Sequence, residues 1–448
     1  AKSFFQKRKH GTRPLKDSIV EQIIDLANQR GVAAEVYYVA SQATPIEFSN
    51  NRLKFLSDKA SGGIALRVIA DGKLGFASST DLTRLSDLLD AAIATSEISP
   101  PVAFDFAENV NFMEQPRDYQ KQTTEQLVES GKELIAKVHE YNSDILVDVN
   151  FQSVDGQIKL ATTNNVDLKK YTQSFSTLVS GNLVRGVNFL EASVAEITRE
   201  RSPDLATILD KLITKFQWAE RKATISSGSY PVIFTPHAFS KTIGRMLRTI
   251  LSGQSVMRNT SPLADKLGQK IFDNHLTVFE DPSLGVSACQ FDDEGVTTRK
   301  KYLINQGMVQ QFYWDRRWAA RQGIESTGNG FRSGIERPNP SLTNLCLSPG
   351  QASLADLIND MDQGLIVDQI LGARQSNVLT GEFSVNIDLG YKVEQGKIIG
   401  RVKDTMVSGN IFAALDNIVA IGDRPEWFRG KFYVPHILFA HLAVAARD

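Results

Sequence analysis

Residues 230–253 read YPVIFTPHAFSKTIGRMLRTILSG, a short apolar run that leads directly into a helical pattern. Tyr230–Phe234 is typical of a buried strand. Thr235 can accept hydrogen bonds from free backbone N–H groups, and proline is tolerated in the first helical turn, where Pro236 stands. Gly253 is the expected end of the helix. The apolar positions at helical spacing are Phe239, Ile243, Met246, Leu247, Ile250 and Leu251. A buried strand that leads into a helix is a rigid mount for a functional site.

This helix carries two side chains with useful chemistry. His237 and Lys241 are four residues apart, so they share one helical face. A helical zinc-hydrolase site would place two histidines on such a face, with a neighbouring glutamate as the base. This segment reads His-Ala-Phe-Ser-Lys instead, so its set of metal ligands is incomplete.

Length and composition predict a two-domain globular protein. A chain of 448 residues exceeds what one hydrophobic core usually supports, and its 42% hydrophobic and 23% charged residues are ordinary values. The formal net charge of −1 provides no long-range attraction to phosphate backbones, so we expect no nucleic-acid partner. No run approaches the roughly 20 apolar residues of a membrane-spanning helix, so we expect no membrane partner either.

Cysteine usage and the N-terminal residues favour a cytoplasmic location. Cys289 and Cys346 alone do not indicate a disulfide framework, and a reducing compartment is the simplest expectation. The basic segment Lys2–Lys9 lacks the apolar stretch and cleavage site of a secretory signal.

Periodicity predicts an α+β protein with two domains, residues 1–222 and 223–448. Helical stripes are expected after Ser18, over Leu82–Ile93 and Leu127–Val138, and after Ser202, with Thr123 opening a capping box. The N-terminal domain should combine these helices with an antiparallel sheet, and the C-terminal domain should be rich in β-structure. The strand-like runs are Glu35–Ala40, Ile46–Phe48, Leu53–Leu56, Gly63–Ala70, Lys73–Ser78, Ile145–Phe151, Gln157–Ala161, Tyr171–Leu183, Leu276–Glu280, Gly295–Arg299, Tyr302–Ile304, Met308–Trp314, Glu382–Ile387, Gly390–Val393 and Lys397–Val402.

Two loops in the second half carry polar groups of interest. Asp292-Asp293-Glu294-Gly295 could hold a hard cation, but consecutive acids before glycine favour a solvated turn. Ser326-Thr327-Gly328-Asn329-Gly330, followed by Phe331 and Arg332, could present backbone N–H groups to an anion or to a peptide carbonyl. The second loop lacks the spacing of a phosphate-binding loop, so it is interpreted as a possible substrate or partner loop.

His275, His436 and His441 have no acidic or cysteine neighbour at ligand spacing, which favours core or surface roles, and His10 and His139 stand in polar contexts. No Gly-x-Ser-x-Gly elbow of a serine hydrolase is present. The residues alone therefore do not identify a reaction.

Several motifs together resemble the TldD/PmbA family, once called modulators of DNA gyrase. Their order covers nearly the whole chain, although no single motif would suffice. The matching segments are Gly63–Val68, Gly72–Ser78, Phe291–Thr298, Ser326–Gly330, Pro340–Gly350, Thr380–Ser384, Gly390–Gly396 and Ser408–Asn410.

The resemblance implies an N-terminal α+β domain, a β-rich C-terminal domain, and a cytoplasmic heterodimeric metallopeptidase that cuts peptides and unfolded proteins. Its TldD-type subunit holds zinc through His-Glu-x-x-x-His and a cysteine near the C-terminus. Here the histidine positions fall on Pro236 and Lys241, the glutamate position on His237, and the cysteine position near Arg429. Proline has no donor atom for a metal, and the two cations would repel one.

The chain therefore resembles the zinc-less PmbA/TldE-like subunit. The expected partner is a TldD-like catalytic subunit, the expected ligand is an extended peptide, and no catalytic residue, metal or cofactor is expected in this chain. Two alternatives remain: a homodimeric, non-catalytic peptide-binding or scaffold protein, and a regulator of a DNA-acting enzyme through protein contact. A weaker alternative is catalysis without a metal, for which His237 would be the first residue to mutate.

Overall fold

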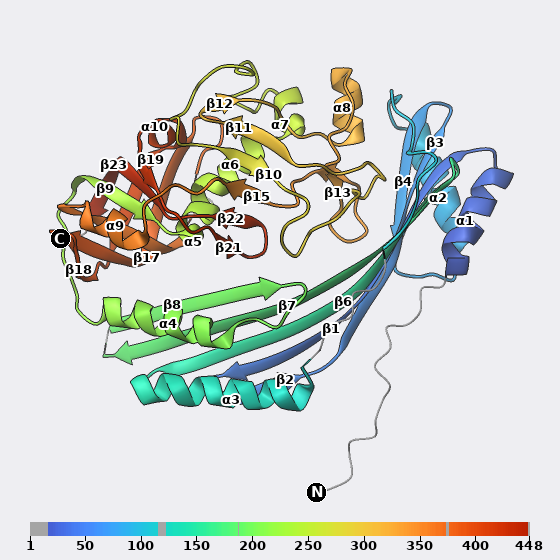
Figure 1. Cartoon of the computed structure of the whole chain (residues 1–448). Coiled ribbons are helices and arrows are strands. Elements are labelled where there is room, and N and C mark those ends of the chain that lie inside the picture. Colours follow the sequence, from blue (N-terminus) through green and yellow to red (C-terminus); the bar gives the residue numbers. More distant parts are fainter. Residues whose placement is uncertain (1–16, 115–121, 187, 373–375, 447–448) are drawn as a thin grey trace, which may run out of the picture.

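The computed structural model describes residues 17–114, 122–186, 188–372 and 376–446. It confirms an α+β fold whose sheets are mainly antiparallel. The N-terminal strands form one long sheet, and the C-terminal strands form a separate β-rich body above it (Figure 1). His10 and the basic segment Lys2–Lys9 lie outside the described residues.

The N-terminal sheet has the strand order β4-β3-β1-β6-β7-β5, with β2 paired to β1 and β8 paired to β7. Every pair is antiparallel except β5 with β7. Its strands are β1 (Ala33–Ser49), β2 (Arg52–Leu56), β3 (Lys59–Ala70), β4 (Lys73–Ser79), β5 (Asn111–Met113), β6 (Leu146–Thr162), β7 (Val166–Arg185) and β8 (Asn188–Thr198).

Local turn chemistry predicts the hairpins of this sheet well. Asn50 and Asn51 connect β1 to β2, and Asp71 and Gly72 connect β3 to β4; all four residues have positive φ. The predicted runs Glu35–Ala40 and Ile46–Phe48, however, belong to the single strand β1, because its polar middle still pairs with β6. Strand β8 was not predicted, and it forms part of the site described below.

Four helices cover this sheet at its two ends (Figure 1). Helices α1 (Asp17–Gln29) and α2 (Leu85–Glu97) contact β1, β3 and β4, whereas α3 (Thr124–Tyr141) and α4 (Leu205–Ala219) pack near the other end. The capping box between Thr123 and Gln126 is confirmed. Helix α4 begins later than expected, because Asp204 caps it instead of Ser202.

Helix α4 lies between the two sheet systems. Its buried face shares one apolar cluster with β6 and β7 on one side and with C-terminal strands on the other. No strand of the N-terminal sheet extends beyond Thr198, and the C-terminal strands begin at Gly228. The division at residues 222 and 223 stays a prediction.

The larger C-terminal sheet closes on itself. The order β16-β9-β23-β19-β17 becomes a ring because β16 also pairs with β17; β18 and β20 attach outside it. A six-stranded sheet of order β12-β11-β10-β15-β22-β21 packs beside it. The C-terminal strands are β9 (Gly228–Phe234), β10 (Val278–Glu280), β11 (Lys301–Asn305), β12 (Met308–Val309), β13 (Gly330–Phe331), β14 (Asn339–Pro340), β15 (Leu345–Leu347), β16 (Gln363–Leu371), β17 (Glu382–Glu394), β18 (Lys397–Arg401), β19 (Thr405–Asn410), β20 (Ile418–Ile421), β21 (Glu426–Phe428), β22 (Phe432–Val434) and β23 (Ile437–Ala446).

The predicted junction between strand and helix is present at β9. Thr235 caps the helix by accepting a hydrogen bond from the Ala238 N–H, and Pro236 occupies the first turn. The helix is interrupted in its middle by one π-helical turn, where the Thr242 hydroxyl donates to the Ala238 carbonyl over 2.6 Å. The C-terminal helical segments are α5 (Pro236–Phe239), η1 (Ser240–Gly244), α6 (Arg245–Ile250), α7 (Gly253–Met257), α8 (Arg316–Gln322), α9 (Leu354–Asn359) and α10 (Ile411–Asp416).

The prediction that Gly253 ends this helix is wrong. The helix ends at Ile250, and Gly253 begins the short helix α7. A Cβ atom at residue 253 would lie 2.1 Å from the Trp314 ring, so glycine is needed for close packing with a residue 61 positions away. No local pattern could reveal that contact.

The acidic turn Asp292–Glu294 is not solvated, contrary to expectation. Its three residues are at most 5% exposed, and two of them, Asp293 and Glu294, meet cations of the N-terminal sheet. Arg67 pairs with Glu294 over 2.7 Å, and Lys170 pairs with Asp293 over 2.7 Å. Burial is possible because these distant cations offset the desolvation of the carboxylates.

The strand predicted at Gly295–Arg299 is absent for a related reason. Both Asp292 side-chain oxygens accept backbone N–H groups, one of them from Glu294 and Val296. These bonds hold the segment as a turn with a single isolated bridge between Phe291 and Thr297. Within the described part of the chain, no helix has the length and apolar character that crossing a membrane requires.

Candidate functional site

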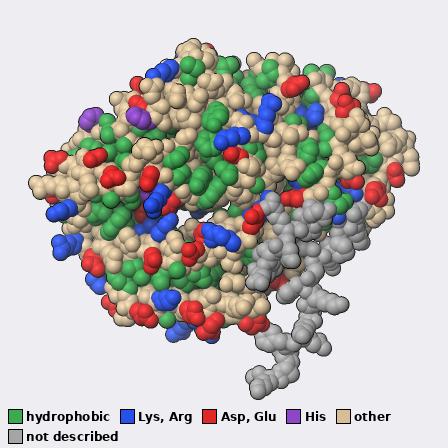
Figure 2. All heavy atoms as spheres, viewed as in Figure 1, with side chains coloured by type: hydrophobic (Ala, Val, Ile, Leu, Met, Phe, Trp, Pro, Cys, Tyr) green, Lys and Arg blue, Asp and Glu red, His purple; other side chains and the backbone are tan. Residues whose placement is uncertain are grey.

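A cavity of about 920 Å³ lies between the N-terminal sheet and the C-terminal body. Strand β8 and helix α4 form one wall, and the β9–α5 junction, the β21–β22 hairpin and the loop 283–288 form the other. Side chains of both charges gather where the two bodies meet (Figure 2). The volume lies within the range of ligand-binding sites.

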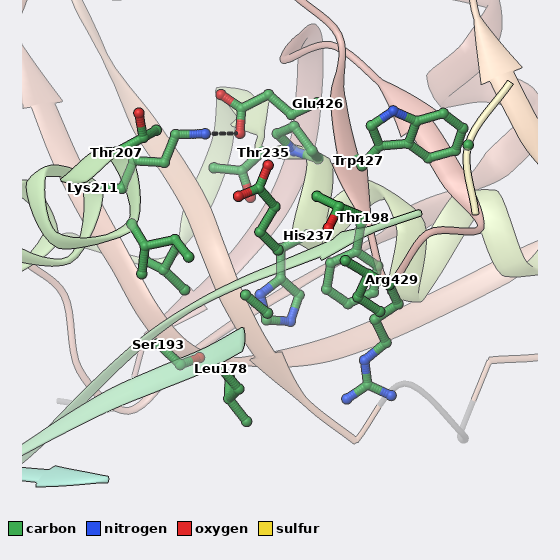
Figure 3. A pocket seen from close by; sticks show the side chains of 18 of the residues that line it. Leu178, Ser193, Thr198, Thr207, Lys211, Thr235, His237, Glu426, Trp427 and Arg429 are labelled. Atoms are coloured by element: carbon green, nitrogen blue, oxygen red, sulfur yellow. Dashed lines mark hydrogen bonds and ion pairs between the residues drawn. The ribbon is translucent and has the colours of Figure 1, made fainter. Parts of the chain in front are cut away.

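His237 projects into this cavity from the first turn of α5 (Figure 3). Its ring stacks on Phe428 with centroids 4.7 Å apart, and its Nε2 atom is buried without a hydrogen-bond partner in the described structure. The pKa of His237 is lowered to about 3: burial is the largest cause, and the cations Lys241, Lys215 and Arg429 contribute in the same direction, against the opposing effect of Asp368. The imidazole is therefore neutral at neutral pH.

Lys241 and Arg429 lie close to this imidazole although 188 residues separate them. Burial lowers the pKa of Lys241, and the guanidinium of Arg429 adds to the effect, whereas Asp388 opposes it. Arg429 lies at the tip of the β21–β22 hairpin, where it and Gly430 both have positive φ. This three-residue turn presents the Arg429 side chain toward the same open space as His237 (Figure 3).

The tertiary structure thus brings together all four positions assigned from the family resemblance. Pro236 is buried in the first helical turn and lines the cavity beside His237. Lys241 follows one turn later, and Arg429 reaches the site from the hairpin. That these positions correspond to a zinc site in relatives stays a prediction.

Sequence reasoning missed the ion pairs that surround the cavity. Lys215 pairs with Asp368 over 2.8 Å, and Thr235 also donates to that carboxylate over 3.3 Å. Lys211 pairs with Glu426 over 2.7 Å (Figure 3). The spacing of the two lysines on α4 indicated a shared polar face, but nothing local showed which carboxylates they meet.

Strand β8 contributes a second group of missed residues. Residues 193–198 line the cavity, with Ser193 at its edge (Figure 3). Beside this strand, Arg201 pairs with Glu196 and Arg199 pairs with Glu114 over 2.7 Å. The alternation of Leu190, Ala192 and Val194 was the available signal for a strand here.

The residues at this site do not fit a zinc ion. The described residues contain no group of three or more histidine, cysteine, aspartate or glutamate side chains that could hold a metal. At the assigned positions the neutral imidazole of His237 is surrounded by cations, which would repel the additional positive charge of a zinc ion. Burial also raises the thiol pKa values of Cys289 and Cys346, to about 11 and about 12, which disfavours the thiolate form that binds metals.

The possible substrate or partner loop lies elsewhere, and none of its residues lines the cavity. The N–H groups of Gly330 and Arg332 donate to Asp292 and Asp293 over 2.8 and 3.0 Å. The Asn329 side chain is fully buried. The Ser326 hydroxyl and the Thr327 backbone N–H donate to the Trp314 carbonyl, and Gly328 has a positive φ of 74°. A role for this loop in substrate or partner contact stays a prediction.

Because the His237 imidazole is neutral in the folded protein, the difference in stability between wild type and a His237→Gln variant should depend on pH. The unfolded chain gains a proton at this residue near its ordinary pKa of 6.5, whereas the folded chain resists protonation down to about pH 3. As the pH falls from 6.5 toward 4, wild type should therefore lose stability relative to His237→Gln by about 1 kcal/mol per pH unit, allowing for partial exposure. Urea denaturation of both proteins at pH 7.5, 6, 5 and 4.5 measures this difference. A constant difference across the series would contradict a neutral buried imidazole.

Comparison with known proteins finds family models and relatives that match this chain. Two family models match the chain: the PmbA/TldA metallopeptidase domain 1 over residues 34–96, and the PmbA/TldA metallopeptidase C-terminal domain over residues 227–446. An uncharacterized protein of Methanocaldococcus jannaschii is 26% identical over 430 residues, which cover 94% of this chain and 98% of that protein. Metalloprotease PmbA of Escherichia coli O157:H7 is 24% identical over 469 residues, which cover 97% of each chain.

Solved structures match over a similar extent. A protein of Thermotoga maritima, described as a modulator of a DNA gyrase, superposes with a TM-score of 0.86 at 25% identity, covering 96% of this chain and all of that one. TldE from Thermococcus kodakarensis gives the same TM-score and coverage at 24% identity, which shows a shared fold.

Proposed function

Because this chain belongs to the PmbA/TldD metallopeptidase family, we propose that it is the zinc-less, PmbA/TldE-like subunit of a TldD/TldE-type peptidase complex. In this role it does not cleave peptides by itself. It joins a TldD-like catalytic subunit in the cytoplasm and helps to enclose or align an extended peptide or an unfolded protein.

The observation that carries this proposal is the chemistry around His237. The helix and its supporting strand have the form of a catalytic mount, with a cap at Thr235 and a cavity in front. The side chains at the assigned ligand positions are nevertheless a proline and two cations. A cavity without a ligand set favours a role in holding substrate over a role in metal-assisted hydrolysis.

A zinc titration with and without a TldD-like relative tests the proposal. The isolated chain should show no stoichiometric tight zinc binding and no peptide cleavage. An equimolar mixture should form a heterodimer, detected by mass, and should cleave an unfolded peptide until zinc is removed by a chelator. The catalytic relative alone is the matched control.

Two outcomes would contradict the proposal. Tight zinc binding together with cleavage by the isolated chain would make it an independent peptidase. A stable homodimer that ignores the TldD-like relative would support the scaffold alternative. The name of the Thermotoga maritima protein keeps a regulatory contact with a DNA-acting enzyme as the second candidate, which co-purification with such an enzyme would support.

A further inference from the structure

Among the described residues that line the cavity, one cationic side chain, that of Arg429, has no counter-ion. The other cations of the cavity each meet a carboxylate: Lys211 and Lys215 from α4, and Arg199 and Arg201 from the end of β8 and beyond. For Arg429, the part of the chain that the structure describes provides no ion pair and no hydrogen bond; its guanidinium lies over the Phe428 ring, at 5.6 Å from the centroid. An unpaired guanidinium at a cavity wall can receive an anion without first breaking a salt bridge.

Arg429 and His237 lie on a common support. The His237 ring centroid is 4.7 Å from that of Phe428, and the Arg429 guanidinium carbon is 5.6 Å from it, so the two groups are at most about 10 Å apart. The buried Nε2 atom of His237 has no partner within the described residues, and a neutral imidazole can donate one hydrogen bond there. Lys241 adds positive potential from the next helical turn, since it contributes to the lowered pKa of His237.

The nearby carboxylates do not cancel this positive potential. Asp368 faces His237 but is held by Lys215 over 2.8 Å. Asp388 acts on Lys241 and is exposed to solvent, where its field is screened. The end of the cavity at Arg429 therefore favours negative charge.

We propose that this end of the cavity binds the carboxylate of a peptide. Arg429 is the principal contact, His237 a hydrogen-bond donor, and Lys241 a supporting charge. That the anion belongs to a peptide rests on the proposed function. It also agrees with the cavity walls, which combine this cationic end with apolar surface for neighbouring side chains, namely Leu178, Val194, Ile197, Trp218, Leu284 and Trp427.

The preference for a carboxylate follows from the shape of the Arg429 guanidinium. A guanidinium matches the two oxygens of a carboxylate with two parallel N–H donors, which makes such pairs both strong and directional. The assigned zinc position thus has the opposite preference in this subunit: it repels a metal cation and attracts a carboxylate. The anion would hold one end of an extended peptide while the rest lies along β8 and α4.

The test uses the full chain in the presence of a chelator and three fluorescent peptides of the same apolar sequence. The first has a free C-terminal carboxylate, the second is amidated, and the third is amidated but contains one internal aspartate. Fluorescence anisotropy should show roughly tenfold tighter binding of the free acid than of the amide. Tight binding of the third peptide as well would assign the site to carboxylates in general, which also supports the proposal.

Variants identify the residue responsible. Arg429→Gln should weaken binding of the free-acid peptide roughly tenfold and leave binding of the amide unchanged, and Arg429→Lys should recover part of the loss. Arg424→Gln is the matched control, because Arg424 is an exposed cation on the approach to the same hairpin that does not line the cavity. Unchanged thermal unfolding of Arg429→Gln shows that the hairpin is intact.

Equal affinity for acid and amide peptides, or no peptide binding at all, would overturn the anion site. Either result leaves the proposed subunit role standing, since that role is decided by zinc binding and by cleavage in the mixture. Conversely, an independent zinc peptidase would end the subunit proposal even if the free-acid peptide bound through Arg429.

Discussion

Arg67→Met is expected to lower the free energy of unfolding by about 3–5 kcal/mol. Arg67 is 2% exposed and lies between two carboxylates that are fully buried. It donates to both oxygens of Glu35 over 2.8 and 2.6 Å and to Glu294 over 2.7 Å. Methionine would fill much of the volume but would remove the positive charge that neutralises Glu35 and Glu294. Arg332 also donates to Glu35, but that pair is already present in wild type, so it adds no new compensation.

Chemical denaturation measures this effect, with Arg30→Met as the control. Arg30 forms an ion pair with Asp90 over 3.0 Å, but both side chains are about half exposed, so the loss should stay below about 1 kcal/mol. Adding Glu294→Gln to Arg67→Met should recover part of the stability by removing one unpaired charge. Equal denaturation midpoints for Arg67→Met and Arg30→Met would show that the buried ion pairs of Arg67 stabilise the fold no more than an exposed pair does.

Asn329→Ala is expected to cost about 2–3 kcal/mol of stability. The Asn329 amide donates to both oxygens of Glu280 over 3.1 and 2.9 Å and to the Ser341 carbonyl over 3.0 Å. Its carbonyl oxygen accepts from Thr327 over 2.7 Å. Alanine would remove all of these bonds inside a fully buried site, where water cannot easily replace them.

The comparison with Asn417→Ala separates this effect from a general cost of losing an amide. Asn417 is exposed and makes one side-chain bond, to the Ala413 carbonyl, so its loss should change stability by no more than about 0.5 kcal/mol. Peptide cleavage by the mixture with a TldD-like relative should be measured for both variants. Reduced cleavage with unchanged stability in Asn329→Ala would instead favour direct contact of this loop with substrate or partner.

Several features were predictable because their causes are local. The hairpins at Asn50-Asn51 and Asp71-Gly72 depend on residues that tolerate positive φ. The capping box at Thr123 and the cap at Thr235 depend on contacts three residues apart. For the same reason the α+β class and the β-rich second half followed from periodicity.

The errors and omissions involve partners that are far apart in the sequence. Glu294 appeared to belong to a solvated turn because Arg67, its counter-ion, is 227 positions away. Gly253 appeared to be a helix stop because its contact with Trp314 could not be seen. Lys215, Asp368 and strand β8 were missed as parts of the site because only the folded chain places them opposite His237.

The sequence alone determined the mount: a buried strand, a capped helix, and His237 and Lys241 on that helix, since each depends on interactions within a few residues. Side-chain chemistry, applied to the positions that the family resemblance assigns, predicts that a proline, a lysine and an arginine do not hold zinc. Only the tertiary structure decided that Arg429 and His237 both lie against Phe428 in a cavity lined by α4 and β8. The physical reason is that charge and burial depend on the summed field and packing of residues that meet only when the two halves of the chain fold against each other.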